Sequence, residues 1–260
     1  MALKYNALYH GDCLKVMQSI KSSSIDMILC DLPYGMTNNQ HDKEINIDML
    51  WRQYKQVIKS NGLVVLSSIQ PFTTKLIMSN LTWFRYDIIW VKDRNTGFLN
   101  ANRMPLRQHE NMLVFYNKLP TYNPQKIEGM PPVHKFTKHC TDGVNYGKTK
   151  LISGGGSTKR YPSSVIFFPA VGTSGSSRLA PTQKPVALFE YLIKTYTNKG
   201  DIVLDNCAGS GTTGEACLNL GRRFILIEKE IKYCKVICKR LNVGINKLAS
   251  HKRKRGNVNG

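Results

Sequence analysis

The segment Val203–Thr213, with the sequence VLDNCAGSGTT, restricts the fold more than any other part of the chain. Its apolar start is typical of a buried strand, Gly209 and Gly211 allow a tight turn, and the residues after them begin a helix. The N-terminus of such a helix presents free backbone N–H groups. A strand, a glycine-rich turn and a helix in this order predict a layered α/β fold with a binding site at the turn.

An acidic residue follows this turn at the spacing typical of a nucleoside-cofactor site. The next apolar run, Arg223–Glu228, ends in a carboxylate about twenty residues further on. A carboxylate there can accept hydrogen bonds from both ribose hydroxyls of a nucleoside cofactor, so we favour that role for Glu228 over a solvated helix cap. No Gly-Lys-Ser or Gly-Lys-Thr follows these glycines, and ATP chemistry of the P-loop kind is therefore disfavoured.

The rest of the chain alternates short apolar runs with segments of helical periodicity. This alternation predicts an α/β fold of the Rossmann-like kind: a mostly parallel, twisted sheet with helices on both faces. We expect Asn61 and Gly62 to end the first long helix. The expected helices are 48–60, the segment after Pro71, 185–199, 213–221 and 230–241, and the expected strands are 25–30, 63–66, 86–92, 111–117, 164–169, 202–205 and 223–228.

A second turn lies at the end of the first of these strands. Strand 25–30 runs directly into Asp31-Leu32-Pro33-Tyr34-Gly35, which places a carboxylate, a rigid turn and an aromatic ring at the carboxyl edge of the sheet. Ligands of open α/β sheets bind at that edge. The same five residues also suit an ordinary turn, and taken alone that interpretation is the better one.

The charge balance narrows the choice of partner. The chain has 37 Lys and Arg against 17 Asp and Glu, a formal net charge of +20, which fits nucleic acid, an anionic membrane surface or simple solubility. Between positions 85 and 184 there are fifteen basic and five acidic residues. From about 119 to 182 the chain is also rich in proline and glycine, which predicts an irregular insertion.

The cysteines and the apolar runs indicate the compartment. Seven cysteines without a repeated Cys-x-x-Cys favour reduced thiols in a cytoplasm, and they argue against zinc. No run approaches ~20 consecutive apolar residues, so we expect no membrane span. We expect a cytoplasmic protein that binds no metal.

Taken together, the motifs resemble those of the amino-group DNA methyltransferases that use S-adenosylmethionine, in their permuted (beta) order. Asp31-Leu32-Pro33-Tyr34 is similar to the family's D/N/S-P-P-Y/F/W motif, and Cys207–Thr212 is similar to F-x-G-x-G-T. Thr182-Gln183-Lys184-Pro185 matches the T-Q-K-P segment, and Gly11-Asp12-Cys13 matches G-D-C. The catalytic motif precedes the cofactor motif, which marks the beta order. The resemblance covers nearly the whole chain.

Two of these motifs depart from the family pattern. Leu32 replaces the first proline, but the family uses the backbone carbonyl of that residue, which leucine also has. Asn206-Cys207 stands where the family often has Pro-Phe, which removes an aromatic ring beside the cofactor.

The resemblance implies a role for each motif residue. It makes Asp31, Leu32, Pro33 and Tyr34 catalytic, and it has the Asp31 carboxylate and the Leu32 carbonyl accept the two amino hydrogens of the target base. Tyr34 would stack on a base flipped out of the duplex. S-adenosylmethionine would be held by Asp12, Asp31, Lys184, Asp205, Ala208, Gly209, Gly211, Thr212 and Glu228.

The expected substrate is the N6 amino group of adenine in duplex DNA, because an aspartate at the first motif position usually accompanies adenine in this family. None of the seven cysteines follows a proline, so methylation at C5 of cytosine is rejected. The alternatives are an N4-cytosine or RNA adenine methyltransferase, and a DNA-binding regulator that keeps the cofactor fold without turnover.

We expect residues 1–94 and 179–246 to form the catalytic and cofactor-binding domain, 95–178 the target-recognition region and 247–260 a basic tail. The polar segment 36–48, which includes His41, is expected to close as a loop on flipped DNA. Beyond double-stranded DNA, a homodimer and a paired restriction enzyme are possible partners. The expected DNA contacts are Arg94, Arg103, Arg107, Lys159 and Arg160.

Overall fold

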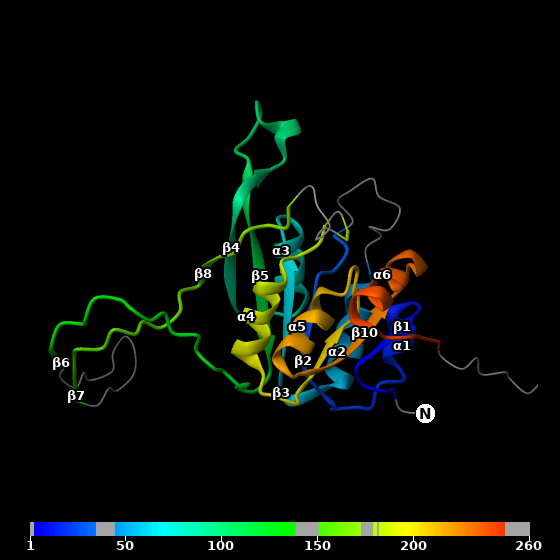
Figure 1. The fold of residues 1–260 in the computed structure, drawn as a ribbon, viewed down its shortest axis with the longest axis horizontal. Helices are drawn as coiled ribbons and strands as arrows, with labels where there is room; N and C mark the ends of the chain where they lie inside the picture. Colours follow the sequence, from blue (N-terminus) through cyan, green and yellow to red (C-terminus); the bar gives the residue numbers. More distant parts are fainter. Residues whose placement is uncertain (1–2, 35–44, 139–150, 173–178, 181, 248–260) are drawn as a thin grey trace, which may run out of the picture. The chain divides into compact units, whose positions relative to one another are not determined.

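A computed structural model describes residues 3–34, 45–138, 151–172, 179–180 and 182–247. The chain divides into two units, Met1–Asn123 with Ser164–Gly260, and Pro124–Ser163. A nine-stranded sheet organises the larger unit, with the strand order β11-β1-β10-β9-β2-β3-β5-β4-β8 (Figure 1). Neighbouring strands are parallel except that β5 runs antiparallel to both β3 and β4.

The strands of this sheet are β1 (Ala7–His10), β2 (Ile25–Cys30), β3 (Ile58–Ser68), β4 (Phe84–Thr96), β5 (Arg107–Tyr116), β8 (Val165–Phe167), β9 (Ile202–Asp205), β10 (Arg223–Glu228) and β11 (Ile245–Asn246). The helices are α1 (Cys13–Met17), α2 (Ile47–Val57), α3 (Phe72–Ser79), η1 (Phe98–Asn100), α4 (Val186–Tyr196), α5 (Thr212–Leu220) and α6 (Ile231–Leu241).

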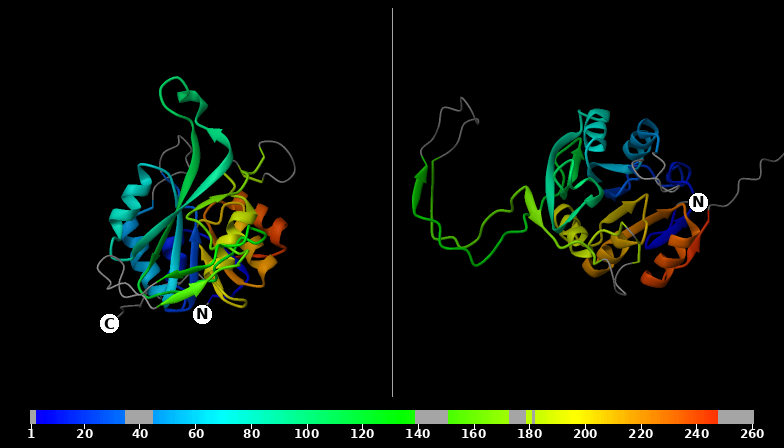
Figure 2. Two further views of the ribbon diagram at one scale, coloured as in Figure 1. Left: turned by 90° about the vertical axis from the view of Figure 1, so that its left-hand side faces the viewer. Right: turned by 90° about the horizontal axis from the view of Figure 1, so that it is seen from above.

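Side-chain alternation along the strands builds two cores, one on each face of the sheet. On β2, Ile28 and Cys30 pack with α1, α2 and α3, whereas Met27 and Leu29 pack with α4, α5 and α6. Figure 2 shows these two sets of helices on opposite faces. The strands between them read as continuous apolar runs because both faces are covered. The predicted fold, a mostly parallel sheet with helices on both faces, is confirmed.

Most expected elements form, but the helix expected at 48–60 ends early. α2 stops at Val57, and β3 begins at Ile58, which pairs with Ile25 of β2. Gly62 does not end the helix; it lies inside β3. A Cβ at Gly62 would lie 2.9 Å from the carbonyl oxygen of Asp26, so only glycine lets the two strands approach this closely. The short strand β1 was not anticipated from the sequence.

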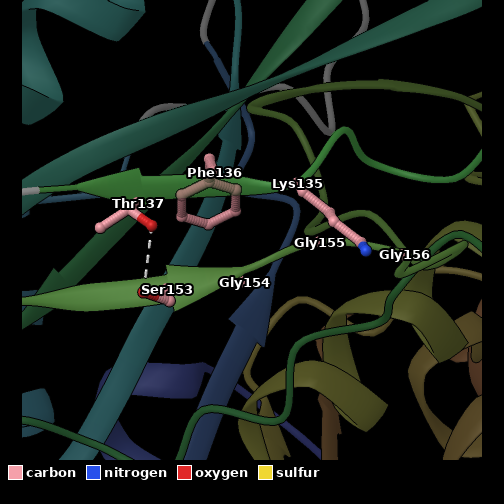
Figure 3. A pocket seen from close by; sticks show the side chains of 7 residues that line it. All are labelled: Lys135, Phe136, Thr137, Ser153, Gly154, Gly155 and Gly156. Carbon is pink, nitrogen blue, oxygen red and sulfur yellow. Dashed lines mark hydrogen bonds between the residues drawn. The ribbon is translucent and has the colours of Figure 1, made fainter.

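The smaller unit, Pro124–Ser163, contains the two-stranded antiparallel sheet of β6 (Phe136–Lys138) and β7 (Ile152–Gly154). Figure 3 shows a shallow pocket at this hairpin, where the Phe136 ring lies over Gly154 and the Thr137 and Ser153 hydroxyls lie 3.2 Å apart. Residues 95–123 and 164–172 belong to the larger unit. The predicted extent of target recognition, 95–178, thus spans parts of both units.

Within the described residues, none of the helices has the length and apolar character required to span a membrane.

Substituting Gly62 tests the close approach of β3 to β2. In Gly62→Ala the new methyl group would meet the Asp26 carbonyl and lie 2.6 Å from Cγ1 of Ile58. We expect a loss of about 1–3 kcal/mol in the free energy of unfolding, measured by urea titration. Gly244→Ala is the control, since a Cβ there meets no atom within 4 Å. Equal midpoints for the two variants would contradict this account.

Candidate active site

The parallel order places the two sequence motifs on adjacent strands. Ile28 of β2 lies beside Leu204 of β9, so the turns that follow Cys30 and Asp205 share the carboxyl edge of the sheet. From β2 the chain crosses through α2 to β3 on one side, and from β9 it crosses through α5 to β10 on the other. Connections that diverge in this way open a crevice between the two strand ends, where open α/β sheets bind ligands.

The Asp31 carboxylate is the centre of the first turn. Its Oδ1 accepts hydrogen bonds from the Tyr34 hydroxyl at 2.8 Å and from the Ser67 hydroxyl, while its Oδ2 accepts from Nζ of Lys184 at 2.6 Å. The Tyr34 ring packs against Phe72, with ring centroids 5.3 Å apart. Three donors, from the turn itself, from β3 and from the segment before α4, therefore fix the orientation of this carboxylate.

Lys184 joins the first turn to the second. Its ammonium reaches Asp31, and its backbone carbonyl accepts a hydrogen bond from Oγ1 of Thr212, the first residue of α5, at 3.4 Å. The ammonium also lies 3.3 Å from Glu110, which pairs with Lys92 at 2.5 Å. Lys184 and Lys92 are both buried. The site therefore contains a chain of four alternating charges.

Electrostatics keep these groups in defined protonation states. Burial alone lowers the pKa of Lys184, but its neighbours Asp31, Tyr34 and Glu110, with Asp31 first among them, together outweigh burial and hold that pKa well above its usual value. Burial likewise raises the pKa of Glu110, and the ammonium groups of Lys184 and Lys92 more than reverse this. Burial and the Asp31 charge raise the pKa of Tyr34, so its hydroxyl stays protonated and donates.

The second turn is the glycine-rich one. Gly209 and Gly211 have φ values of +52° and +83°, in the left-handed region that side chains disfavour. The N–H of Gly209 donates to Oε2 of Glu228 at 2.8 Å, and the N–H of Ala208 donates to the Ile227 carbonyl at 3.0 Å. The turn is therefore fastened to the end of β10. A Cβ at Gly209 would meet nothing closer than the Cys207 carbonyl oxygen at 4.0 Å, which leaves open space above the turn.

Two buried carboxylates flank this turn. Glu228 ends β10 and also accepts from the N–H of Glu230 at 2.7 Å; burial raises its pKa. Asp205 ends β9 and accepts from the Thr213 hydroxyl at 2.5 Å and from the Cys207 N–H at 3.0 Å. Burial raises the pKa of Asp205 to about 7. Asp12 is exposed, but it lies near Glu228, because His10 pairs with Glu228 and Gly11 donates to its carbonyl.

Cys207, where the family often has an aromatic residue, interacts with the thiols of Cys13 and Cys30. Cys30 is buried, and this desolvation raises its pKa to about 12. The neighbouring Asn206 accepts a hydrogen bond from the buried Tyr54 hydroxyl at 2.6 Å. Among the described residues, no group of three or more His, Cys, Asp or Glu side chains could hold a metal ion.

A family model described as DNA methylase, of the N6/N4 type (N6_N4_Mtase), matches residues 25–239 and includes both turns and Lys184. The chain belongs to this DNA methylase family. The predicted membership of the amino-group DNA methyltransferases is confirmed.

Known relatives match nearly the whole methylase. It is 29% identical to the DNA adenine methyltransferase YhdJ of Escherichia coli (strain K12), over 96% of this chain and 89% of the relative. It is 28% identical to the type II methyltransferase M2.DpnII of Streptococcus pneumoniae, over 90% and 88%. The solved M1.HpyAVI–SAM complex matches with a TM-score of 0.60 and 26% identity, over 91% of this chain and 99% of that one. The cytosine-N4-specific PvuII methyltransferase shares the fold, with a TM-score of 0.64 at 14% identity over 95% and 96%.

Of the residues predicted to bind DNA, some have ion-pair or backbone partners within the methylase and others are exposed without an ion-pair partner among the described residues. Arg94 pairs with Asp93 at 2.9 Å, and Lys159 pairs with Glu128 at 2.5 Å. Arg160 donates to backbone carbonyls of its own unit, including that of Ser157 at 2.9 Å. Arg103 and Arg107 are exposed at the β4–β5 hairpin, and neither has an ion-pair partner within the described part of the chain. Most of the predicted loop, 36–44 with His41, and the tail 248–260 lie outside the described residues.

Sequence reasoning missed three side chains of this site: Ser67, Lys92 and Glu110. A signal for Lys92 existed, because Ile88, Trp90 and Lys92 share one face of β4 and a lysine on an otherwise apolar, buried face requires an acidic partner. Ser67 ends an apolar run on the strand next to β2, so it belongs to the same sheet edge. Nothing in the sequence pairs Glu110 with Lys184.

The pKa of Asp205 predicts a pH-dependent stability for the methylase. An acid whose pKa rises from 3.8 when unfolded to about 7 when folded contributes stability below pH ~4, and that contribution is lost as the pH rises through 7. The loss is on the order of 4 kcal/mol. In Asp205→Asn this contribution is absent, so the variant should gain thermal stability relative to wild type from pH 4 to 7, measured as Tm at each pH. A constant Tm difference across this window would contradict the assignment.

Proposed function

We propose that the methylase transfers a methyl group from S-adenosylmethionine to the N6 amino group of an adenine in duplex DNA. The observation that carries this proposal is the single hydrogen-bonded chain from Asp31 through Lys184 to Thr212, which brings the candidate catalytic turn and the glycine turn into one site. The names of YhdJ, an adenine methyltransferase, and of the M1.HpyAVI–SAM complex support the choice of base and cofactor.

The residues at the glycine turn fit this cofactor. The space above Gly209 admits a ligand against the backbone, and Glu228 ends the adjacent strand where an acid can accept hydrogen bonds from ribose hydroxyls. Asp12 lies close enough to this strand end to face the adenine ring. When bound, S-adenosylmethionine supplies a methyl group on a positively charged sulfur. We assign its binding to Asp12, Asp31, Lys184, Asp205, Ala208, Gly209, Gly211, Thr212 and Glu228.

The first turn would activate the amino group of the target. That nitrogen is a poor nucleophile, because its lone pair is delocalised into the base. If the Asp31 carboxylate and the Leu32 carbonyl each accept one amino hydrogen, the lone pair is directed away from the ring and toward the methyl group. A carboxylate has about four lone-pair sites, so Asp31 can accept this hydrogen and still keep Lys184. Pro33 fixes the turn, and the Tyr34 ring offers a face on which the flipped base can stack.

The charges around Asp31 suit this role. As the methyl group moves, positive charge develops on the amino nitrogen, and a fixed carboxylate beside it stabilises that charge without reorganisation. The ammonium of Lys184 holds the carboxylate in place, and Glu110 offsets part of the ammonium charge. Lys184 and Glu110 would therefore act as positioning residues for Asp31.

Removing the Asp31 carboxylate tests the catalytic assignment. We expect Asp31→Ala to lower kcat by about a thousand-fold or more, because the main acceptor for the amino group is lost. Binding of DNA, measured by calorimetry, should remain largely intact, and binding of S-adenosylmethionine should weaken far less than kcat falls, because the other residues assigned to the cofactor remain. The control is Asp201→Ala, because Asp201 lies just before β9, at the edge of the sheet opposite Asp31. Unchanged turnover in Asp31→Ala would end the catalytic role of this carboxylate, whereas an absence of turnover in the wild type would favour a binding-only regulator.

Methylome sequencing tests the choice of base. DNA from cells that lack other methylases and express this chain should carry N6-methyladenine at one recurrent sequence. The same data report the recognition site. A new motif carrying only N4-methylcytosine would overturn the adenine assignment while leaving the amino-methyltransferase chemistry in place.

The remaining assignments concern partners and location. We assign DNA contacts to Arg94, Arg103, Arg107, Lys159 and Arg160, with target recognition in 95–178. A homodimer and a paired restriction enzyme are included in the proposal, as is action in a cytoplasm, where the DNA substrate and reduced thiols are found.

A further inference from the structure

The tip of the β4–β5 hairpin exposes large apolar side chains. Between Thr96 and Arg107, Leu99 is 100% exposed, Phe98 is 68% exposed and Met104 is 57% exposed. Single exposed apolar residues are common on protein surfaces, but three within seven positions on one turn mark a binding surface. Figure 1 and the left view of Figure 2 show this hairpin projecting past its neighbouring strands.

The tip is an ordered turn. Gly97 enters it with φ +91°, the helix η1 follows, and the N–H groups of Arg103 and Met104 donate to the Asn100 carbonyl at 2.9 and 3.0 Å. Below it, Thr96 pairs with Arg107, and Oγ1 of Thr96 donates to the Arg107 carbonyl at 3.1 Å. These contacts present the apolar side chains in a set geometry.

The hairpin leaves the sheet at the edge that holds the candidate active site. β4 runs in the same direction as β3, because both are antiparallel to β5, so the end of β4 lies at the same edge as Asp31. The base of the hairpin is part of the site itself, through the Lys92–Glu110–Lys184 ion pairs. From Lys92 to Phe98 the strand can extend roughly 20 Å. The tip can thus reach across a duplex whose target base lies at Asp31.

The positive charge around the tip indicates that its partner is an anionic molecule. From Arg94 to His109 there is no Asp or Glu, and the exposed Arg103 and Arg107 flank the apolar residues. Arginines beside exposed apolar side chains match a DNA duplex, which presents phosphates outside and stacked bases inside. A two-stranded hairpin also fits the width of the major groove.

We propose that Phe98 and Leu99 enter the base stack of the DNA next to the target adenine and keep the duplex open while that base is in the active site. Phe98 would stack on an exposed base, and Arg103 and Arg107 would bind the adjacent phosphates. This inference rests on the proposed function, since it requires a base that leaves the duplex. It adds side chains that act on DNA opening and take no part in methyl transfer.

The test uses the double variant Phe98→Ser/Leu99→Ser of the full chain. Its substrate is a duplex that carries the recognition site, with 2-aminopurine in place of the target adenine for binding and adenine for turnover. In the wild type the 2-aminopurine fluorescence should rise on binding. In the variant we expect this rise to be lost and kcat/KM to fall about ten-fold or more, with binding of S-adenosylmethionine unchanged.

A second duplex, with an abasic site opposite the target, distinguishes an effect on opening of the base pair from an effect on DNA affinity alone. Here no base pair has to be broken, so the variant should recover to within about two-fold of wild type. The matched control is Leu81→Ser, which replaces a 55% exposed leucine between α3 and β4, outside the region assigned to target recognition, and which should behave as wild type on both duplexes.

Three results would overturn the inference. The double variant could show no loss of kcat/KM on the paired duplex, or an equal loss of kcat/KM on both duplexes. It could also show unchanged turnover with a change of oligomeric state, which would assign the tip to contact with a second copy of the chain. A different result would contradict the proposed function and leave the inference about the tip open to its own test. If the wild type methylates only cytosine, the adenine assignment is lost, and the tip is then judged by kcat/KM on paired and abasic-opposed cytosine duplexes.

Discussion

The ion pair between Asp31 and Lys184 connects the parts of this structure on which its chemistry depends. The two residues are 153 positions apart, and their charged atoms lie 2.6 Å apart at a largely buried site. Removing two charges from water costs several kcal/mol per ion, so such a pair persists only with good geometry and further partners. Tyr34, Ser67 and Glu110 supply those partners. The pair is better understood as positioning a carboxylate than as stabilising the fold.

The sheet topology explains how these residues meet. Because β2 and β9 are neighbours and their crossovers diverge, two turns that are distant in the chain open into the same crevice. The helix α4 follows Lys184 directly and packs on the face of the sheet opposite α2, so Lys184 enters the crevice at its edge. The hairpin that extends β4 and β5 begins at the same network, at Lys92 and Glu110. The DNA contact proposed for the tip and the orientation of Asp31 therefore depend on the same two strands, β4 and β5.

Buried carboxylates characterise the cofactor half of the site. Asp205 and Glu228 both end strands at the crevice, and burial raises the pKa of each. Backbone N–H groups of Cys207, Gly209 and Glu230 compensate part of this cost. Carboxylates held in this way favour a positively charged or hydroxyl-rich ligand, which agrees with the cofactor proposed.

The sequence by itself determined the fold class and the two chemical turns. Apolar runs such as Ile25–Cys30 and Arg223–Glu228 are buried on both faces, so their composition is a strong local signal, and the glycines at 209 and 211 mark a backbone shape that few other residues adopt. It misplaced the end of α2, because the helical period continues through Ile58 while pairing with β2 takes that residue into β3. Only the tertiary structure decided that Ser67, Lys92 and Glu110 surround Asp31, and that Phe98 and Leu99 project from the active-site edge. Those placements depend on strand order and register, which are set by contacts between residues far apart in the chain.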